Sequence, residues 1–431
     1  MVGGTIIIPM FTTTTLTNKL NIIRAPIAGA SSLTVLALLP VGSRYEGVRD
    51  AGAAHFLEHM LFKGTKRRPQ PLDVSRILDA VGAEFNAFTS KEYTGYYVKV
   101  DHAFAERAVD LLADMLFHSL LDTKEFERER GVIIEEIRMY EDMPMRHVFD
   151  LVEEAMYPGH RLGRNIAGSE KSITAMKLTN LRMFWEKYYQ PNNVAVVIAG
   201  ATDGVPELVT KYFGAERGTG KNTNQFDRVS GSFRRKPLVE TKDTDQAHVA
   251  LDFPALPYGH AGESATNILR IILGGTMSSR LFVEIREKRG LAYSVSADVD
   301  RYRDTGNFQI YSGLDRARLP ESLKVIAHEI QKIREKGITE EELAEAKSHL
   351  RGKLTLQLED STDLAVWYAR GFLFYPDAWT PEQYIQRIEG VTTPMVNAMA
   401  QKILQPRGMG VACIGPYSEG DFNQMLKKAF G

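Results

Sequence analysis

The segment KLTNLRMFWEKYYQPNNVAVVIAGA, residues 177–201, decides the fold because its pattern occurs twice in the chain. Its first part has apolar residues at helical spacing, and a turn at Pro191 leads into an apolar run that is typical of a buried strand. The segment GVTTPMVNAMAQKILQPRGMGVACIGP, residues 390–416, repeats this order, and its Pro406 lies 215 positions after Pro191. A repeat at almost half the chain length predicts two similar halves.

Strand-like segments earlier in each half support the duplication. SLTVLALLPVG, from Ser32, and AHVALDFPALP, from Ala247, place Val35 and Val249 at matching positions. In both halves such strands alternate with amphipathic helical patterns. We therefore predict an α+β fold with two homologous domains, residues 1–213 and 238–431, each a mainly antiparallel sheet covered by helices. The polar, glycine-rich stretch 214–237 is predicted to be the linker between them.

The composition excludes several classes of partner. The 431 residues include 53 Lys and Arg against 54 Asp and Glu, a net charge of -1, so no basic field would hold nucleic acid or an anionic membrane. The N-terminus lacks the pattern of a signal peptide, and no apolar run reaches the roughly 18 residues of a membrane span. We expect a cytoplasmic protein that does not bind membranes.

Two further features of the sequence carry structural expectations. The apolar run Ile6–Ile8 followed by Thr12–Thr15 predicts an edge strand or an ordered arm. Cys413 is the single cysteine and lies in the apolar run VACIG. It excludes an internal disulfide and a cysteine-based zinc cluster, and it is predicted to be a buried thiol.

The first half contains a constellation with metal-binding chemistry, AGAAHFLEHMLFKGT, residues 51–65. On a helix, His55, Glu58 and His59 stand at i, i+3 and i+4, so two imidazoles and a carboxylate project from one face. Two neutral imidazoles are good zinc ligands, and the adjacent carboxylate can take a proton from a metal-bound water without being a ligand itself. The alternative is a helix with two core or capping histidines.

A catalytic zinc site needs a third protein ligand, and an acidic helix over residues 122–142 offers candidates. Glu129 and Glu136 are seven positions apart and share a helix face with Val132 and Ile133, which indicates a partly buried face. Periodicity alone leaves Glu135 and Glu136 as alternatives for the ligand. The acids of this stretch that we considered are Glu125, Glu127, Glu129, Glu135, Glu136 and Glu141.

These residues resemble the inverzincin peptidases of the pitrilysin, insulin-degrading-enzyme and mitochondrial-processing-peptidase family. The resemblance covers nearly the whole chain and is strongest with the processing-peptidase branch of roughly 50 kDa proteins. The segments that carry it are HFLEHMLFKGT (55–65), GAEFNAFTSKEYTGYY (82–97), ERERGVIIEEI (127–137), YYQPNNVAVVIAG (188–200) and SSRLFVEIREKRGLAYSV (278–295).

The resemblance implies a role for each residue of the motif. The zinc ligands would be His55, His59 and Glu136, with Glu58 as general base and proton shuttle. Matching ERERGVIIEE to the family pattern favours Glu136 over Glu135 and makes Glu129 a supporting acid that orients a ligand.

Substrate-binding residues are also implied by the resemblance. The strand that contains Asn86, Ala87 and Phe88 would line the cleft and pair with an extended substrate, although a plain strand-turn role for Asn86 is an equal alternative. Arg286 and Tyr293 match an Arg/Tyr pair that binds substrate and supports the oxyanion. Without the resemblance, Arg286 reads as a surface charge and Tyr293 as a half-buried strand aromatic. The second-half helix ATNILRIILGG, residues 265–275, has no histidine, so only the first half is expected to bind metal.

The function that the resemblance implies is a Zn2+-dependent endopeptidase that cleaves unstructured peptides or presequences in a closed chamber formed like a clamshell. Because this chain carries both the metal motif and the Arg/Tyr pair, a homodimer is expected, with a heterodimer as the alternative. A non-catalytic scaffold subunit of the same fold is the competing function, but such subunits typically have damaged metal motifs.

Overall fold

The computed structural model describes residues 11–218, 225–229 and 236–431, which form two compact units. The apolar run Ile6–Ile8 and much of the predicted linker lie outside the described residues. Of these described residues, the first unit contains those within 1–137, 165–227 and 354–383, and the second contains those within 138–164, 228–353 and 384–431. Within the described ranges, no helix is both long enough and apolar enough to cross a bilayer.

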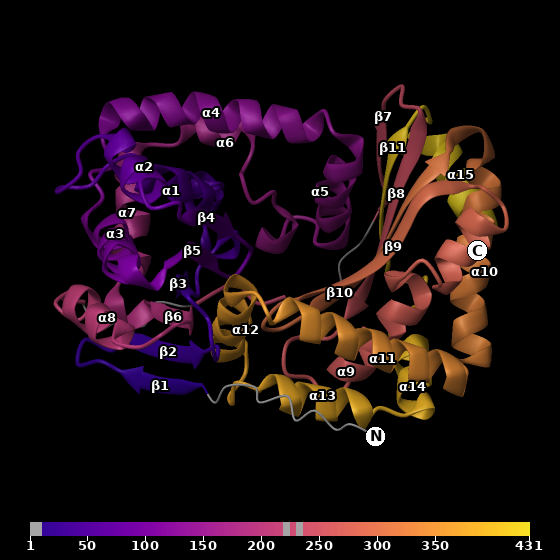
Figure 1. Ribbon diagram of the computed structural model, residues 1–431. Coiled ribbons are helices and arrows are strands. Elements are labelled where there is room, and N and C mark those ends of the chain that lie inside the picture. The colour runs from indigo at the N-terminus through magenta and orange to yellow at the C-terminus, as the bar shows by residue number, and fades with distance from the viewer. Residues whose placement is uncertain (1–10, 219–224, 230–235) are drawn as a thin grey trace, which may run out of the picture. The chain divides into compact units, whose positions relative to one another are not determined.

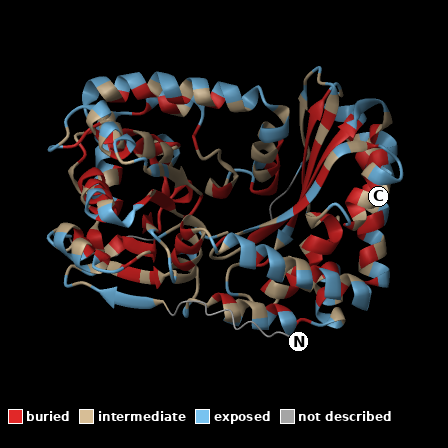
Figure 2. Ribbon diagram, in the orientation of Figure 1, coloured by how far each residue is buried: buried red, intermediate tan, exposed pale blue. Residues whose placement is uncertain are grey.

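The first unit is built on a six-stranded sheet in the order β1-β2-β6-β3-β5-β4 (Figure 1). Only β2 and β6 pair in parallel, so the sheet is mainly antiparallel. The predicted threonine strand forms the exposed edge β1 (Figure 2). The strands are β1 (Thr12–Thr15), β2 (Asn21–Pro26), β3 (Ser32–Leu39), β4 (Glu84–Thr89), β5 (Thr94–Asp101) and β6 (Ala195–Gly200).

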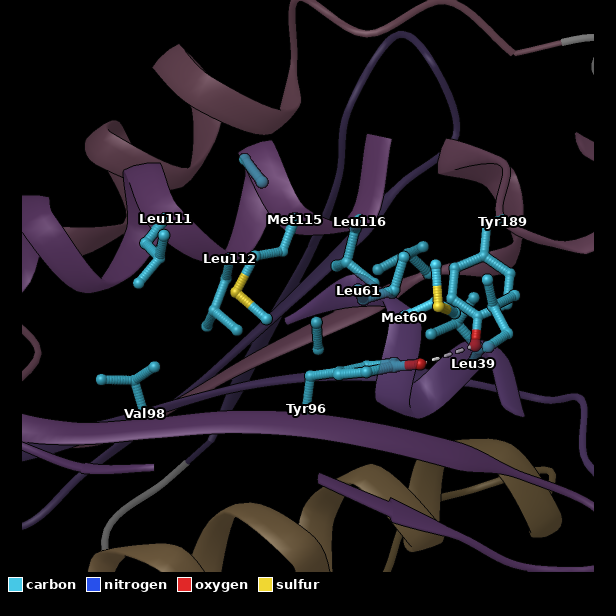
Figure 3. Close-up of a cluster of buried hydrophobic side chains, with 14 of the residues drawn as sticks. Leu39, Met60, Leu61, Tyr96, Val98, Leu111, Leu112, Met115, Leu116 and Tyr189 are labelled. Carbon is cyan, nitrogen blue, oxygen red and sulfur yellow. Dashed lines mark hydrogen bonds between the residues drawn. The ribbon is translucent and has the colours of Figure 1, made fainter. Parts of the chain in front are cut away.

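Helices cover both faces of this sheet. Successive residues of β3, such as Val35 and Leu36, point into separate hydrophobic clusters on opposite faces. The larger cluster packs against several helices of the first half (Figure 3). The helices with residues in this unit are α1 (Ala53–Leu61), α2 (Pro71–Asp79), α3 (Ala105–His118), α4 (Thr123–Glu141), α6 (Glu170–Ala175), α7 (Leu178–Tyr188), α8 (Val205–Phe213) and α12 (Ser361–Phe374).

The second unit repeats this design with a five-stranded sheet in the order β7-β11-β8-β10-β9. Its strands are β7 (Leu238–Thr241), β8 (Gln246–Ala255), β9 (Ala292–Arg301), β10 (Gly306–Asp315) and β11 (Gly410–Gly415). Its helices are α5 (Pro144–Met156), α9 (Glu263–Arg270), α10 (Leu319–Lys336), α11 (Glu340–Gln357), α13 (Pro381–Glu389), α14 (Thr393–Ile403) and α15 (Glu419–Phe430), with π-helical turns at Ile271–Gly275 and Phe282–Glu287.

The strand registers confirm the duplicated fold. Val35 of β3 lies opposite Ile198 of β6, and Val249 of β8 lies opposite Cys413 of β11. The same pairing therefore recurs in both sheets at nearly the spacing of the sequence repeat. Cys413 is fully buried in its strand, and burial raises the pKa of its thiol to about 12.

Two helices do not follow the sequence halves. The α12 helix, from the second half, packs on β6, β3 and β2 of the first sheet, and α5, from the first half, packs on β11 and β8 of the second (Figure 1). Each sheet has an apolar outer face that needs such a cover. The compact units consequently differ from the domains 1–213 and 238–431 by exchange of residues 138–164 and 354–383. As limits of the sequence repeat, those boundaries stay a prediction.

We expect Leu364→Ala to destabilise the first unit, because Leu364 of α12 is only 2% exposed against the sheet. Truncating a buried leucine costs about 2–5 kcal/mol. The three tryptophans, at 185, 367 and 379, all belong to this unit, so tryptophan fluorescence during thermal unfolding reports on it.

Leu356→Ala is the matched control, because Leu356 is 69% exposed. It should change the free energy of unfolding by no more than about 0.5 kcal/mol. Equal losses in the two variants would contradict the covering role of α12.

Candidate metal centre

Helix α1 holds the two histidines at the edge of the first core. Phe56, Leu57, Met60 and Leu61 are fully buried, and Figure 3 shows Met60 and Leu61 packed in the cluster together with residues of α3. His55, Glu58 and His59 lie on the remaining, half-buried face of the helix. The apolar face thus fixes the direction in which the motif points.

The start of α1 is fixed by a buried carboxylate. Glu46 is 2% exposed, and its two oxygens accept hydrogen bonds from the backbone N–H groups of Gly52, at 2.8 Å, and Ala54, at 2.7 Å. Gly52 has φ of 95°, and a Cβ there would lie 2.6 Å from the carbonyl oxygen of Ala167. A negative group at a helix N-terminus also interacts favourably with the helix dipole. Glu46 and Gly52 together determine where α1 begins.

Helix α4 brings Glu136 to the two imidazoles. Its Oε1 lies 3.7 Å from Nε2 of His55, and its Oε2 lies 3.4 Å from Nε2 of His59. One ligand atom of each residue lies within 4.8 Å of the others. Glu135 is exposed, so the structure places Glu136 rather than Glu135 in this group. Val132, expected on the same partly buried face, is instead 47% exposed, whereas Ile133 is fully buried.

The donor set fits a divalent transition metal. Two imidazole nitrogens and one carboxylate are a ligand set of catalytic zinc sites. Burial and the neighbouring His59 lower the pKa of His55 to about 4 against the opposing effect of Glu136, so His55 is neutral at pH 7. Its Nδ1 is buried and has no hydrogen-bond partner among the described residues.

His59 has the opposite protonation tendency. Burial lowers its pKa, but hydrogen bonds and charge from Glu129 and Glu136 outweigh burial and raise the pKa to about 9. A metal that binds here must therefore displace a proton.

Glu129 lies behind His59 and contacts two partners. Its Oε2 is 3.2 Å from Nδ1 of His59, and its Oε1 is 2.8 Å from Nζ of Lys63. Burial raises the pKa of Glu129, but the hydrogen bonds from His59 and Lys63 outweigh burial and lower it overall. A carboxylate in this place orients the ring and favours the tautomer whose Nε2 is free for metal.

Glu58 accepts a hydrogen bond through its Oε2 from the hydroxyl of Thr89, the last residue of β4. Burial raises the pKa of Glu58 above its usual value, and Thr89 acts against this shift. Nearby, the Tyr96 and Tyr189 hydroxyls are 2.8 Å apart (Figure 3). Burial is the largest cause that raises the pKa of both phenols, and the charge of Glu58 adds to it.

The three strand residues expected to bind substrate lie on β4, the edge strand of the first sheet. Asn86 is exposed, and its Oδ1 accepts a hydrogen bond of 2.8 Å from the N–H of Ala87. Ala87 packs against the larger core cluster and Phe88 against the cluster under α12. The outer edge of β4 has no partner strand among the described residues.

Arg286 and Tyr293 belong to the second unit and contact each other. The Arg286 guanidinium lies 5.0 Å from the Tyr293 ring centre, and its Nη1 donates to the Tyr293 carbonyl oxygen at 2.8 Å. Tyr293 is 73% exposed, so the alternative interpretation, a half-buried strand aromatic, was wrong. Its position on the edge strand β9 explains the exposure.

Three residues near the group were not singled out in the sequence: Glu46, Lys63 and Thr89. Lys63 is four positions after His59. Thr89 is two positions after Ala87 and four after Phe85, so all three share the strand face that meets α1. Those two spacings could have indicated from the sequence that Lys63 and Thr89 lie near the group. Glu46 had none, because it precedes the helix by several irregular residues.

Two sheets of duplicated topology, with a His–His–Glu group and an adjacent glutamate, are the features of an inverzincin-type metallopeptidase fold. Family models match residues 24–170, described as insulinase (peptidase family M16), and residues 175–350, described as the peptidase M16 inactive domain. The chain belongs to this insulinase family, which confirms the resemblance. The match to an inactive domain agrees with the absence of histidine from the second-half helix at 265–275.

Relatives extend over almost the full chain. An uncharacterized zinc protease of Mycobacterium tuberculosis is 37% identical over 425 residues, 97% of this chain and 96% of its own. The beta subunit of the bovine mitochondrial-processing peptidase (Bos taurus) is 31% identical over 92% of this chain and 83% of its own. The crystal structure of a protease from Helicobacter pylori has a TM-score of 0.88 at 26% identity and covers 95% of this chain and 100% of its own.

We expect Glu46→Ala to loosen the start of α1, because two buried N–H groups lose their acceptor. At about 1–3 kcal/mol for each unsatisfied group, the loss in free energy of unfolding is about 2–6 kcal/mol. Urea unfolding followed by tryptophan fluorescence measures it.

The control is Glu207→Ala, which removes an exposed glutamate from the first turn of α8. It should cost less than about 1 kcal/mol. A Glu46→Ala variant as stable as this control would show that the cap does not hold α1.

Proposed function

We propose that the protein is a zinc-dependent endopeptidase. The observation that carries the proposal is the group of His55, His59 and Glu136, whose ligand atoms lie within 4.8 Å of one another beside Glu58. The cofactor is zinc, in keeping with the ligand set and with relatives that are named zinc proteases. These three residues would hold the metal, and Glu129 would orient His59.

Bound zinc lowers the pKa of a coordinated water from about 15.7 to about 7. The role of Glu58 is to accept a proton from the attacking water and return it to the leaving amine. Its raised pKa suits this task, since a base is most effective when its pKa approaches the working pH.

The proposed substrates are unstructured peptides or presequences. An extended peptide could add to the open edge of β4, beside Asn86, Ala87 and Phe88, by main-chain hydrogen bonds. Folded proteins rarely offer such a free strand. Arg286 and Tyr293 are proposed to bind the substrate and to donate to the carbonyl oxygen as it becomes negative. A closed chamber around the peptide is part of the same proposal.

A non-catalytic scaffold subunit is the competing function. That role needs none of the ligand residues, and no observation favours it here. The intact set of two histidines and two glutamates supports the enzyme instead.

Glu58→Gln should retain zinc and lose peptide cleavage, because the amide keeps the shape of the side chain but cannot take a proton. The expected fall in kcat is at least about 100-fold, the low end for general acid–base catalysis. Quenched fluorescent peptides measure cleavage, and elemental analysis of the same sample measures zinc.

The matched control is Glu135→Gln, the same change at the exposed neighbour of Glu136. It should keep both cleavage and zinc. Undiminished cleavage by pure Glu58→Gln protein would refute the role of Glu58. Wild-type protein that holds no zinc after refolding in the presence of the metal would support the scaffold function.

We also propose a homodimer, since one chain carries both the metal motif and the Arg/Tyr pair. The bovine relative is named as a beta subunit, so a second type of chain is the alternative. Light scattering of the pure protein should give a molar mass near twice 48.3 kDa. A particle of 48.3 kDa that cleaves peptides would contradict the dimer.

A further inference from the structure

We propose that the hydroxyl of Thr89 positions Glu58 for proton transfer, so that the edge strand β4 fixes the orientation of the general base. This inference rests on the proposed function. Thr89 is a positioning residue in this proposal, because it acts on the reaction only through Glu58.

The backbone of Thr89 is held firmly. It ends β4 opposite Thr94 of β5, and the N–H of Ser90 donates to the Tyr93 carbonyl at 2.8 Å to close the hairpin. Thr94 is fully buried, and its hydroxyl donates to the Val41 carbonyl at 2.8 Å. The carbonyl of Ser90 in turn accepts from the N–H of Ser43 at 3.1 Å. Thr89 therefore projects from an end of the strand that several backbone and side-chain hydrogen bonds hold in place.

The side chain of Thr89 points at α1 because of the alternation along β4. Phe85 and Ala87 pack against the core cluster that includes α1, whereas Phe88 packs under α12 on the other face. Thr89 continues the series of Phe85 and Ala87. Its β-branched side chain has few χ1 rotamers, so the hydroxyl has a defined direction.

Glu58 needs such a partner because its own helix does not fix its carboxylate. The side chain has three rotatable bonds, and the Thr89 hydroxyl is the hydrogen-bond donor to Glu58 within the described residues. The bond engages Oε2 and leaves Oε1 to receive the proton. A carboxylate that turned freely would present the correct oxygen only part of the time, and small displacements of a catalytic group are costly.

The geometry also connects substrate binding to the base. If a peptide pairs with the edge of β4, the strand that seats it is the strand that holds Glu58. Loss of the hydroxyl should then leave binding intact and slow the chemical step, which separates an effect on kcat from one on KM.

The test compares Thr89→Val, which keeps the shape and removes the hydroxyl, with Thr89→Ser, which keeps the hydroxyl. We expect kcat to fall on the order of tenfold in the valine variant, the usual effect of losing one hydrogen bond to a charged group, with KM and zinc content unchanged. The serine variant should restore kcat to within about threefold of wild type. Thr13→Val, on the exposed strand β1, is the matched control and should match wild type.

A second readout needs neither metal nor activity. In metal-free protein, Thr89→Val should lower the melting temperature when Glu58 is present, and the shift should disappear in a Glu58→Ala background, since coupled residues are not additive. Additive shifts, an undiminished kcat in the valine variant, or an equal loss of kcat in the serine variant would each overturn the proposal. A wild-type protein that cleaves no peptide would refute the proposed function, while the coupling in stability would still decide whether Thr89 holds Glu58.

Discussion

The candidate centre depends on one convergence, that of Glu136 with the imidazoles of His55 and His59. Neither helix could bring this about alone. The α1 helix is fixed by its buried apolar face and by Glu46 at its start, and α4 is fixed by Phe126, Ile133 and Ile137, which are buried on its inner face. Both helices pack into the same core cluster. The ligand geometry is therefore a consequence of hydrophobic packing, and the polar residues occupy positions that the core has already set.

The two histidines of this group have different electrostatic surroundings. Glu129 lies between the buried side of His59 and the ammonium of Lys63, whose side chain is 27% exposed. His55 lacks an equivalent carboxylate in the described structure, and burial keeps it neutral. Two histidines that are one helical turn apart thus have opposite protonation tendencies, because burial dominates the pKa of His55 and carboxylate partners dominate the pKa of His59.

Much of this organisation could be predicted from the sequence, because it rests on local periodicity. The duplicated helix–turn–strand segments, the α1 face and the pairing of Glu129 with Glu136 along α4 all follow from spacings within one element. Periodicity did not distinguish Val132 from Ile133, because the spacing of Glu129 and Glu136 placed both on one face, whereas only Ile133 falls in the buried series Glu129, Ile133 and Ile137. Periodicity also could not show which sheet α5 and α12 would cover, because an apolar helix face predicts burial but does not specify the surface on which the helix packs. The bond between Thr89 and Glu58 joins two elements across 31 positions, and such contacts depend on tertiary packing.

The exchanged helices α5 and α12 have a consequence for cooperativity. Each sheet is completed by a helix that belongs to the other half of the sequence, so unfolding of either half would strip a cover from the other sheet. Neither half of the sequence therefore contains the helix that covers its own sheet, and cutting the chain at the linker would leave one apolar sheet face uncovered in each fragment.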